Sequence, residues 1–203
     1  MYNVASDPLL VNAIFSGNAA HNGGGAIYNE ESHPTLTNVA FDANSAASGG
    51  GIYNYESKPR IQNSILWDNR ASAGPQILNT SISTPTLTYC DVEGSGGSGA
   101  GWDAALGVDG GGNLDADPLF VAPVLPVGAA GAGGGGAPRT AIWDLRLRAG
   151  SPAIDAGDND LLPPGVITDL AGRPRIVNGT VDLGAYEFGF GIYLPLSLRT
   201  AAP

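Results

Sequence analysis

The sequence predicts an all-β protein built as a parallel β-helix, or β-solenoid, with coils of about 25 residues and an irregular C-terminal cap. The phrase "GGGAIYNEESHP" at residues 23–34 returns as "GGGIYNYESKP" at residues 49–59, and a weaker copy, "GPQILNTSISTP", occupies residues 74–85. Ile27 and Ile52 are 25 residues apart, as are Pro34 and Pro59. A fixed period of this length indicates a solenoid, because one repeat cannot bury its apolar face alone.

Each coil is expected to consist of short strands joined by turns. A second recurring unit, "VNAIFSGN", "TNVAFDAN" and "QNSILWDN", ends at Asn18, Asn44 and Asn69. Its apolar clusters are rich in Ile, Val and aromatic residues and are bounded by Gly, Pro or Asn, which is typical of strands and turns. The Leu-x-x-Leu-x-Leu pattern of leucine-rich repeats and the i, i+3, i+4 pattern of helical repeats are absent. A parallel β-helix is the architecture that fits.

The repeated asparagines predict side-chain ladders, because equivalent residues of successive coils lie roughly 4.8 Å apart. Stacked amides can hydrogen-bond along such a column, and Asn tolerates the left-handed backbone of sharp corners. The three expected structural ladders are Asn12, Asn38 and Asn63; Asn18, Asn44 and Asn69; and Asn29, Asn54 and Asn79. The apolar columns expected inside the coils are Phe15, Phe41, Leu66 and Val92, and Ile27, Ile52 and Ile77. Ser57 is expected to be exposed.

The chain divides into three regions by periodicity and composition. Residues 1–93 are expected to form the coils, N-terminally truncated or uncapped, because no signal peptide precedes the first apolar run. Residues 94–141 are expected to be a loop and a glycine-rich excursion, with Trp102 as an anchor. Residues 142–203 are expected to form a C-terminal, anchor-associated cap that continues the solenoid.

Two resemblances become specific at this point. Gly24-Gly25-Ala26-Ile27, with Phe15-x-x-Asn18 and Phe41-x-x-Asn44, resembles paired motifs of polymorphic outer-membrane and autotransporter-like adhesins, which are right-handed β-helices of the pectate-lyase-like superfamily. That likeness covers residues 9 to about 93. Further on, "NLDADPLFVAP", "LRLRAGSPAIDAGDND", "TDLAGRPRI" and "VDLGAYEF" are similar to the C-terminal region of secreted bacterial β-helix proteins of the choice-of-anchor Q family. The resemblance implies a right-handed helix, export, and display at the cell surface.

Composition excludes several partners. The net charge of −10 argues against nucleic acid and against anionic membrane surfaces, both of which are recognised by basic patches. No run of eighteen apolar residues exists, so no membrane span is expected. Cys90 is a single cysteine that can form neither an internal disulfide nor a cysteine-based zinc site, and a buried thiol is expected.

Carboxylates suggest two kinds of chemistry. Cleavage of an acidic polysaccharide would need a carboxylate cluster beside a basic residue; Glu31 stacked over Glu56, with Lys58 and Arg60 nearby, is the candidate in the coils. A solvated charged face is the favoured interpretation, and no catalytic residue is assigned. In "DAGDND", the calcium candidates are Asp155, Asp158 and Asp160. The favoured alternative is that these aspartates cap turns and pair with Arg148, Arg173 or Arg175; no cofactor is expected, although calcium is possible.

Three functions remain in order of preference. The first is a non-catalytic, extracellular cell-surface or adhesion-type module, with carbohydrate or ligands on host or neighbouring cell surfaces as partners. The second is a fragment of a polysaccharide lyase or glycoside hydrolase that binds acidic glycans, because a fold does not exclude activity. The third is a structural filament subunit that associates with itself head to tail.

Overall fold

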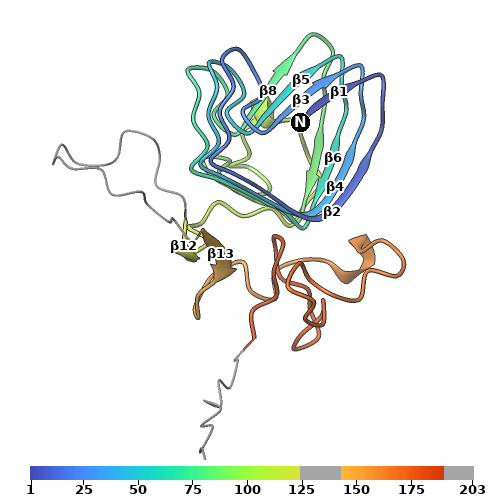
Figure 1. Cartoon of the computed structure of the whole chain (residues 1–203), viewed down its shortest axis with the longest axis vertical. Helices are drawn as coiled ribbons and strands as arrows, with labels where there is room; N and C mark the ends of the chain where they lie inside the picture. Colours follow the sequence, from blue (N-terminus) through green and yellow to red (C-terminus); the bar gives the residue numbers. More distant parts are fainter. Residues whose placement is uncertain (124–142, 190–203) are drawn as a thin grey trace, which may run out of the picture.

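The computed structural model describes residues 1–123 and 143–189 and confirms the predicted fold class. The chain forms a parallel β-solenoid of about four turns, each about 25 residues long (Figure 1). The greater part of the predicted glycine-rich excursion and the last part of the predicted cap lie outside the described residues.

One face of the solenoid is a four-stranded parallel sheet in the order β1-β3-β5-β8. Its strands are β1 (Tyr2–Val4), β3 (Ile27–Glu30), β5 (Ile52–Tyr55) and β8 (Ile77–Thr80). Ile27 pairs with Ile52, and Ile52 with Ile77, so each step of 25 residues in the sequence is one coil of the stack.

A second, seven-stranded sheet forms the flank of the solenoid. Its strands are β2 (Leu9–Ser16), β4 (Thr35–Asp42), β6 (Arg60–Gln62), β7 (Ile65–Trp67), β9 (Thr86–Thr88), β10 (Asp91–Val92) and β11 (Val108–Asp109). Strand β4 pairs with β6 through its first half and with β7 through its second half. The corner between the halves is formed by Asn12, Asn38 and Asn63, each with positive φ, a conformation that Asn tolerates better than most residues.

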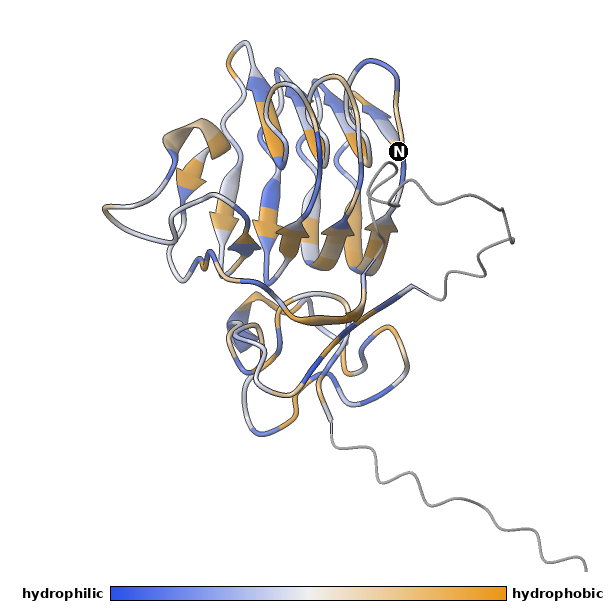
Figure 2. Ribbon diagram, turned by 90° about the vertical axis from the view of Figure 1, so that its left-hand side faces the viewer, coloured by the Kyte–Doolittle hydropathy of each residue, from blue (hydrophilic) through white to orange (hydrophobic). Residues whose placement is uncertain are grey.

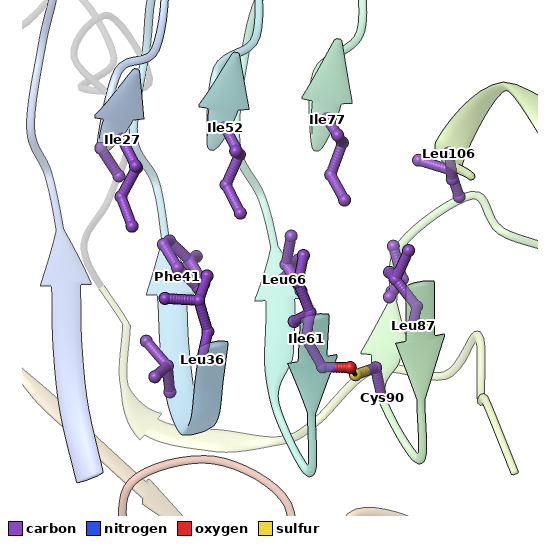
Figure 3. Packing of buried hydrophobic residues seen from close by; sticks show 13 residues of the cluster. Ile27, Leu36, Phe41, Ile52, Ile61, Leu66, Ile77, Leu87, Cys90 and Leu106 are labelled. Atoms are coloured by element: carbon purple, nitrogen blue, oxygen red, sulfur yellow. Dashed lines mark hydrogen bonds between the residues drawn. The ribbon is translucent and has the colours of Figure 1, made fainter. Parts of the chain in front are cut away.

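The interior of the coils holds the first hydrophobic core. The predicted columns Ile27, Ile52, Ile77 and Phe41, Leu66, Val92 are buried there (Figure 3). Phe15 in the first coil is half-buried, and its ring stacks on Phe41 with centroids 5.1 Å apart. Cys90 lies in the same core, where its thiol donates a hydrogen bond to the Ile61 carbonyl and burial raises its pKa to about 12. The thiol is therefore a core group.

Two of the three predicted asparagine ladders are present. Asn29 donates to Asn54 and Asn54 to Asn79, both at 2.9 Å, and Asn3 extends this ladder by one rung. In the second ladder, Asn18 donates to Asn44 and Asn44 to Asn69, both at 2.8 Å. Asn29, Asn44 and Asn54, inside the stack, are fully buried, and their amides are satisfied from coil to coil, as buried polar groups must be.

Ser57 is fully buried, so the expectation that it is exposed is wrong. Its hydroxyl accepts the Ser32 amide at 3.0 Å, and its own amide donates to the Ser83 hydroxyl at 3.0 Å. Ser6 donates to Ser32 in the same way. These serines form a further ladder. Each is one repeat away from the next in the sequence, so the 25-residue period could have predicted it.

Residues 94–113 close the end of the solenoid that follows β8 and β9. The short helix η1 (Ala104–Leu106) places Leu106 in the interior core, and Trp102 packs against that core. The ladder ends here, because Asn79 donates to the Ala105 carbonyl at 2.9 Å. Strand β11 pairs with β9, so the stack extends beyond residue 93.

The C-terminal region does not continue the stack as expected; residues 143–189 lie beside the coils, against the second sheet (Figures 1 and 2). Strand β13 (Asp144–Leu147) pairs antiparallel with β12 (Phe120–Ala122), and the short helix η2 spans Asn159–Leu161. The physical reason is a second apolar cluster between the flank and this region. It buries Ala40, Ile65, Phe120, Leu145, Leu147, Ala153 and Leu183.

The third predicted ladder binds the C-terminal region. Asn63 donates to the Asp158 carbonyl and accepts the Asp158 amide, both at 2.9 Å. Asn38 donates to the Asp182 carbonyl at 3.4 Å, and Asn12 to the Thr168 carbonyl at 2.8 Å. The expected bonds from one asparagine to the next do not form, because these side chains point out of the coils at a corner that the C-terminal region covers.

Candidate functional site

The candidate site is a pocket of about 250 Å³ at the seam between the solenoid flank and the segment around β12. The residues that line it are Asp42, Trp67, Asp68, Asp117, Leu119, Phe120, Pro123 and Arg148. A larger hollow of about 670 Å³ lies at the first coil, but its walls are largely the glycine-rich turn at residues 18–25. The smaller pocket is the better candidate, because aromatic and charged side chains from distant parts of the sequence converge there.

The solenoid wall of the pocket is made by the end of β7. Trp67 pairs in register with Asp42 of β4, so both side chains point outward from the same column. Trp67 is half-buried. Asp68 follows with a φ of 52°, a left-handed corner that short polar residues tolerate. Its amide donates to Glu93 Oε2 at 2.8 Å, and its carboxylate lies 3.2 Å from the Arg70 guanidinium.

The opposite wall is made by the turn before β12 and the end of β13. The exposed Asp117 carboxylate accepts the Leu119 amide at 2.9 Å, which holds a turn in which Leu119 has a φ of 52°. Phe120 is anchored in the second core. Arg148 is exposed; its amide donates to the Leu119 carbonyl at 3.0 Å, and its guanidinium donates to the Val121 carbonyl at 2.5 Å.

The surroundings of the pocket are acidic. Burial raises the pKa of Glu93, and the negative charges of Asp68 and Asp115 raise it further. Burial raises the pKa of Asp91 to about 7, and the charges of Asp115 and Asp117 act in the same direction. Like charges that disfavour ionisation of their neighbours mark a negative local potential.

The arrangement suits recognition of a small polar ligand. The pocket combines an aromatic face with carboxylate acceptors and one guanidinium donor. These are the usual components of a largely preformed small-molecule site. The sequence contained one signal for it: Trp67 is a large aromatic residue at a position where the preceding coils carry Ser16 and Asp42. The opposite wall could not be foreseen, since no repeat relates Asp117 or Arg148 to the coils.

The loop of the predicted calcium candidates is held by hydrogen bonds from its backbone amides. Asp158 caps η2 and accepts the Asp160 amide at 3.0 Å, while the Asp155 amide donates to Asp182 at 2.7 Å. Within residues 1–123 and 143–189, no group of three or more His, Cys, Asp or Glu side chains is arranged to hold a metal ion.

A buried ion pair joins two of the C-terminal motifs. Arg175, in "TDLAGRPRI", lies 3.2 Å from Glu187, in "VDLGAYEF", and both side chains are inaccessible to solvent. Arg175 also donates to the carbonyls of Asp182 and Gly184 at 2.7 and 3.0 Å. Burial raises the pKa of Glu187 to about 8. The predicted pairing of Asp155, Asp158 or Asp160 with an arginine is therefore wrong for the described residues, because Arg175 pairs with Glu187 and Arg148 bonds a carbonyl at the pocket.

Glu31 and Glu56 lie at coil corners with φ of 49° and 50°. The Ser81 hydroxyl donates to Glu56 at 3.3 Å. Neither glutamate lines the pocket at the seam, and Lys58 and Arg60 are exposed. The structure therefore does not bring these predicted candidates to the pocket at the seam, which Trp67 lines.

The fold and site define a parallel β-solenoid whose flank is covered by its own C-terminal region, with a polar, aromatic pocket at the seam. No family model, curated protein or solved structure matches the chain. None of the helices in the described residues is long and apolar enough to cross a membrane.

Proposed function

We propose that the protein is a non-catalytic, extracellular cell-surface or adhesion-type module that binds a carbohydrate in the pocket at the seam. The observation that carries this proposal is the meeting of Trp67, Asp68, Asp117 and Arg148 around one hollow. Sugars present both hydroxyl groups and apolar ring faces, so a half-buried aromatic ring beside carboxylate and guanidinium groups complements them.

The rigidity of the scaffold supports a binding role. Trp67 ends β7, a strand paired on both sides, to β4 and β10; Asp68 follows it directly, and Phe120 is fixed in the second core. A preformed site loses little conformational entropy when the ligand binds. Export and surface display rest on the resemblance of the repeats and of the C-terminal motifs to adhesins and choice-of-anchor Q proteins.

Carbohydrate binding can be tested by replacing the aromatic wall. Trp67→Ala should weaken glycan affinity at least about tenfold, or about 1.4 kcal/mol, because it removes the ring that faces the sugar. Trp143→Ala is the matched control, since Trp143 is exposed and lies outside the pocket. The measurement is a glycan array followed by calorimetric titration of the hits. Equal affinities for the two variants, or no glycan bound by the parent protein, would refute the proposal.

The non-catalytic part of the proposal has its own test. With polygalacturonate and calcium, the protein should release no unsaturated product that absorbs in the ultraviolet, and no reducing ends. Turnover that Glu56→Ala or Asp68→Asn abolishes would instead support the polysaccharide lyase or hydrolase interpretation.

A further inference from the structure

The pocket carries acidic groups on both walls. Asp68 projects from the solenoid and Asp117 from the turn before β12. The partner of Asp68, Arg70, forms with it an exposed pair, which water and salt screen strongly. Asp117 bonds a backbone amide, which leaves its negative charge in place. The basic group among the described lining residues is Arg148, whose guanidinium already bonds the Val121 carbonyl.

Further carboxylates surround these two. Glu93 accepts the Asp68 amide, and Asp115 accepts the amides of Gly94 and Gly96, both at 2.9 Å. The charges of Asp68 and Asp115 raise the pKa of Glu93, so these groups repel one another in the absence of a cation. A ligand with its own carboxylate would add to this repulsion, whereas a ligand with a positive charge would relieve it.

Trp67 adds a second preference for positive charge. The electron-rich face of an indole ring attracts an ammonium group placed within about 6 Å of its centroid, and Trp is the strongest aromatic partner for such a contact. Trp67 is half-buried and lines the pocket together with Asp68, so an electrostatic interaction there is less screened than in open solvent.

We infer that the pocket selects a sugar residue with an unsubstituted amino group, a hexosamine, over both its N-acetylated form and a uronic acid. This inference rests on the proposed carbohydrate-binding function and names the ligand class of that site. A volume of about 250 Å³ is smaller than the roughly 300–1,000 Å³ typical of sites for drug-sized ligands, which suits one sugar residue of a longer chain.

The test is calorimetric titration at pH 6, below the ordinary pKa of amines, with oligosaccharides of matched length. Four ligands are compared. Three are oligomers of glucosamine, N-acetylglucosamine and galacturonic acid, and the fourth is a lysine-rich peptide. The glucosamine oligomer should bind at least about tenfold more tightly than the acetylated oligomer, and the galacturonic acid oligomer most weakly. The preference should decrease as salt rises, because screening weakens exposed charge interactions.

Asp68→Asn separates the charge from the fold. Asn tolerates the left-handed backbone at this corner, so the variant should fold, and its ratio of glucosamine to N-acetylglucosamine affinity should fall several-fold toward one. Glu31→Gln, an exposed acid at another corner, is the matched control and should leave the ratio unchanged.

Several results would overturn the inference. If the acetylated oligomer or galacturonic acid oligomer binds best, the pocket binds carbohydrate but not through an ammonium group, and the proposed function stands alone. If the lysine-rich peptide binds as tightly as the glucosamine oligomer, the site recognises an ammonium group without selecting a sugar. If no saccharide binds, both the inference and the proposed function fail.

Discussion

Asp91 lies in an environment unlike that of an ordinary surface aspartate. It is fully buried in the column of Ala40 and Ile65 on the outer side of the flank. Its Oδ1 accepts the Ala116 amide at 3.1 Å, while Oδ2 has no hydrogen-bond partner among the described residues. Burial therefore favours the neutral carboxyl group and raises its pKa to about 7.

The raised pKa predicts that stability falls as pH rises from about 4 to about 7. In this window Asp91 is protonated in the native state but ionised in the unfolded chain. The stabilisation that is present at acid pH is therefore lost as the pH rises through the native pKa of about 7. One pKa unit corresponds to about 1.4 kcal/mol, so the loss should amount to at least ~1 kcal/mol. The measurement is urea unfolding at several pH values.

Asp91→Asn is the variant that isolates this contribution. Glu187 contributes in the same direction through its pKa of about 8, so some pH dependence should persist in the variant. The difference in unfolding free energy between parent and variant should therefore change between pH 4 and pH 7. A difference that stays constant over this range would show that Asp91 titrates like an exposed aspartate.

At the scale of elements, the asparagine ladders connect one strand to the next. Asn54, in β5, accepts from Asn29 and donates to Asn79, so its amide serves both neighbouring coils. The three residues are equivalent in the repeat, and the parallel register brings them together without any contribution from the loops.

Asn54→Ala should lower the free energy of unfolding by about 1 to 3 kcal/mol, because it removes the acceptor of the buried Asn29 Nδ2 and the donor to Asn79 Oδ1. Asn22→Ala, at an exposed turn position, should stay within about 0.5 kcal/mol of the parent. Chemical unfolding of both variants measures the difference. Similar midpoints would mean that water replaces the ladder at no cost.

At the scale of the whole molecule, two hydrophobic cores share one sheet. The first fills the coils, and the second lies between the flank and the C-terminal region. Leu183 contributes to the second core and is 1% exposed, and the Gly184 amide donates to the Asn63 carbonyl of the solenoid at 2.8 Å. The C-terminal region and the coils should therefore unfold together.

Leu183→Ala should destabilise the entire protein by about 2 to 5 kcal/mol, the usual cost of a cavity in a core. Far-UV circular dichroism and the fluorescence of Trp102, in a background with Trp67 and Trp143 replaced by Phe, should report the same lowered midpoint. Ile167→Ala is the control, since Ile167 is 78% exposed. A midpoint for Trp102 that does not move would show that the coils are stable without the C-terminal region.

The 25-residue period determined the coils by itself. A translational repeat states which residues are equivalent, and in a parallel stack equivalent residues become neighbours, so Ile27 over Ile52 and Asn29 beside Asn54 followed directly from counting. The same logic failed for Asn12, Asn38 and Asn63, because the period does not state whether a corner side chain faces its neighbours or another part of the chain.

Only the tertiary structure decided what covers the coils. Residues 94–113 and 143–189 have no period, so their sequence did not reveal that Leu106 closes the first core or that Leu183 helps to form the second. The pocket depends on this cover, since Trp67 is one wall and Asp117 and Arg148 are the other. The C-terminal region packs on the apolar outer face of the flank because this buries apolar surface. Such burial depends on which surfaces meet in space and not on the spacing of residues along the chain.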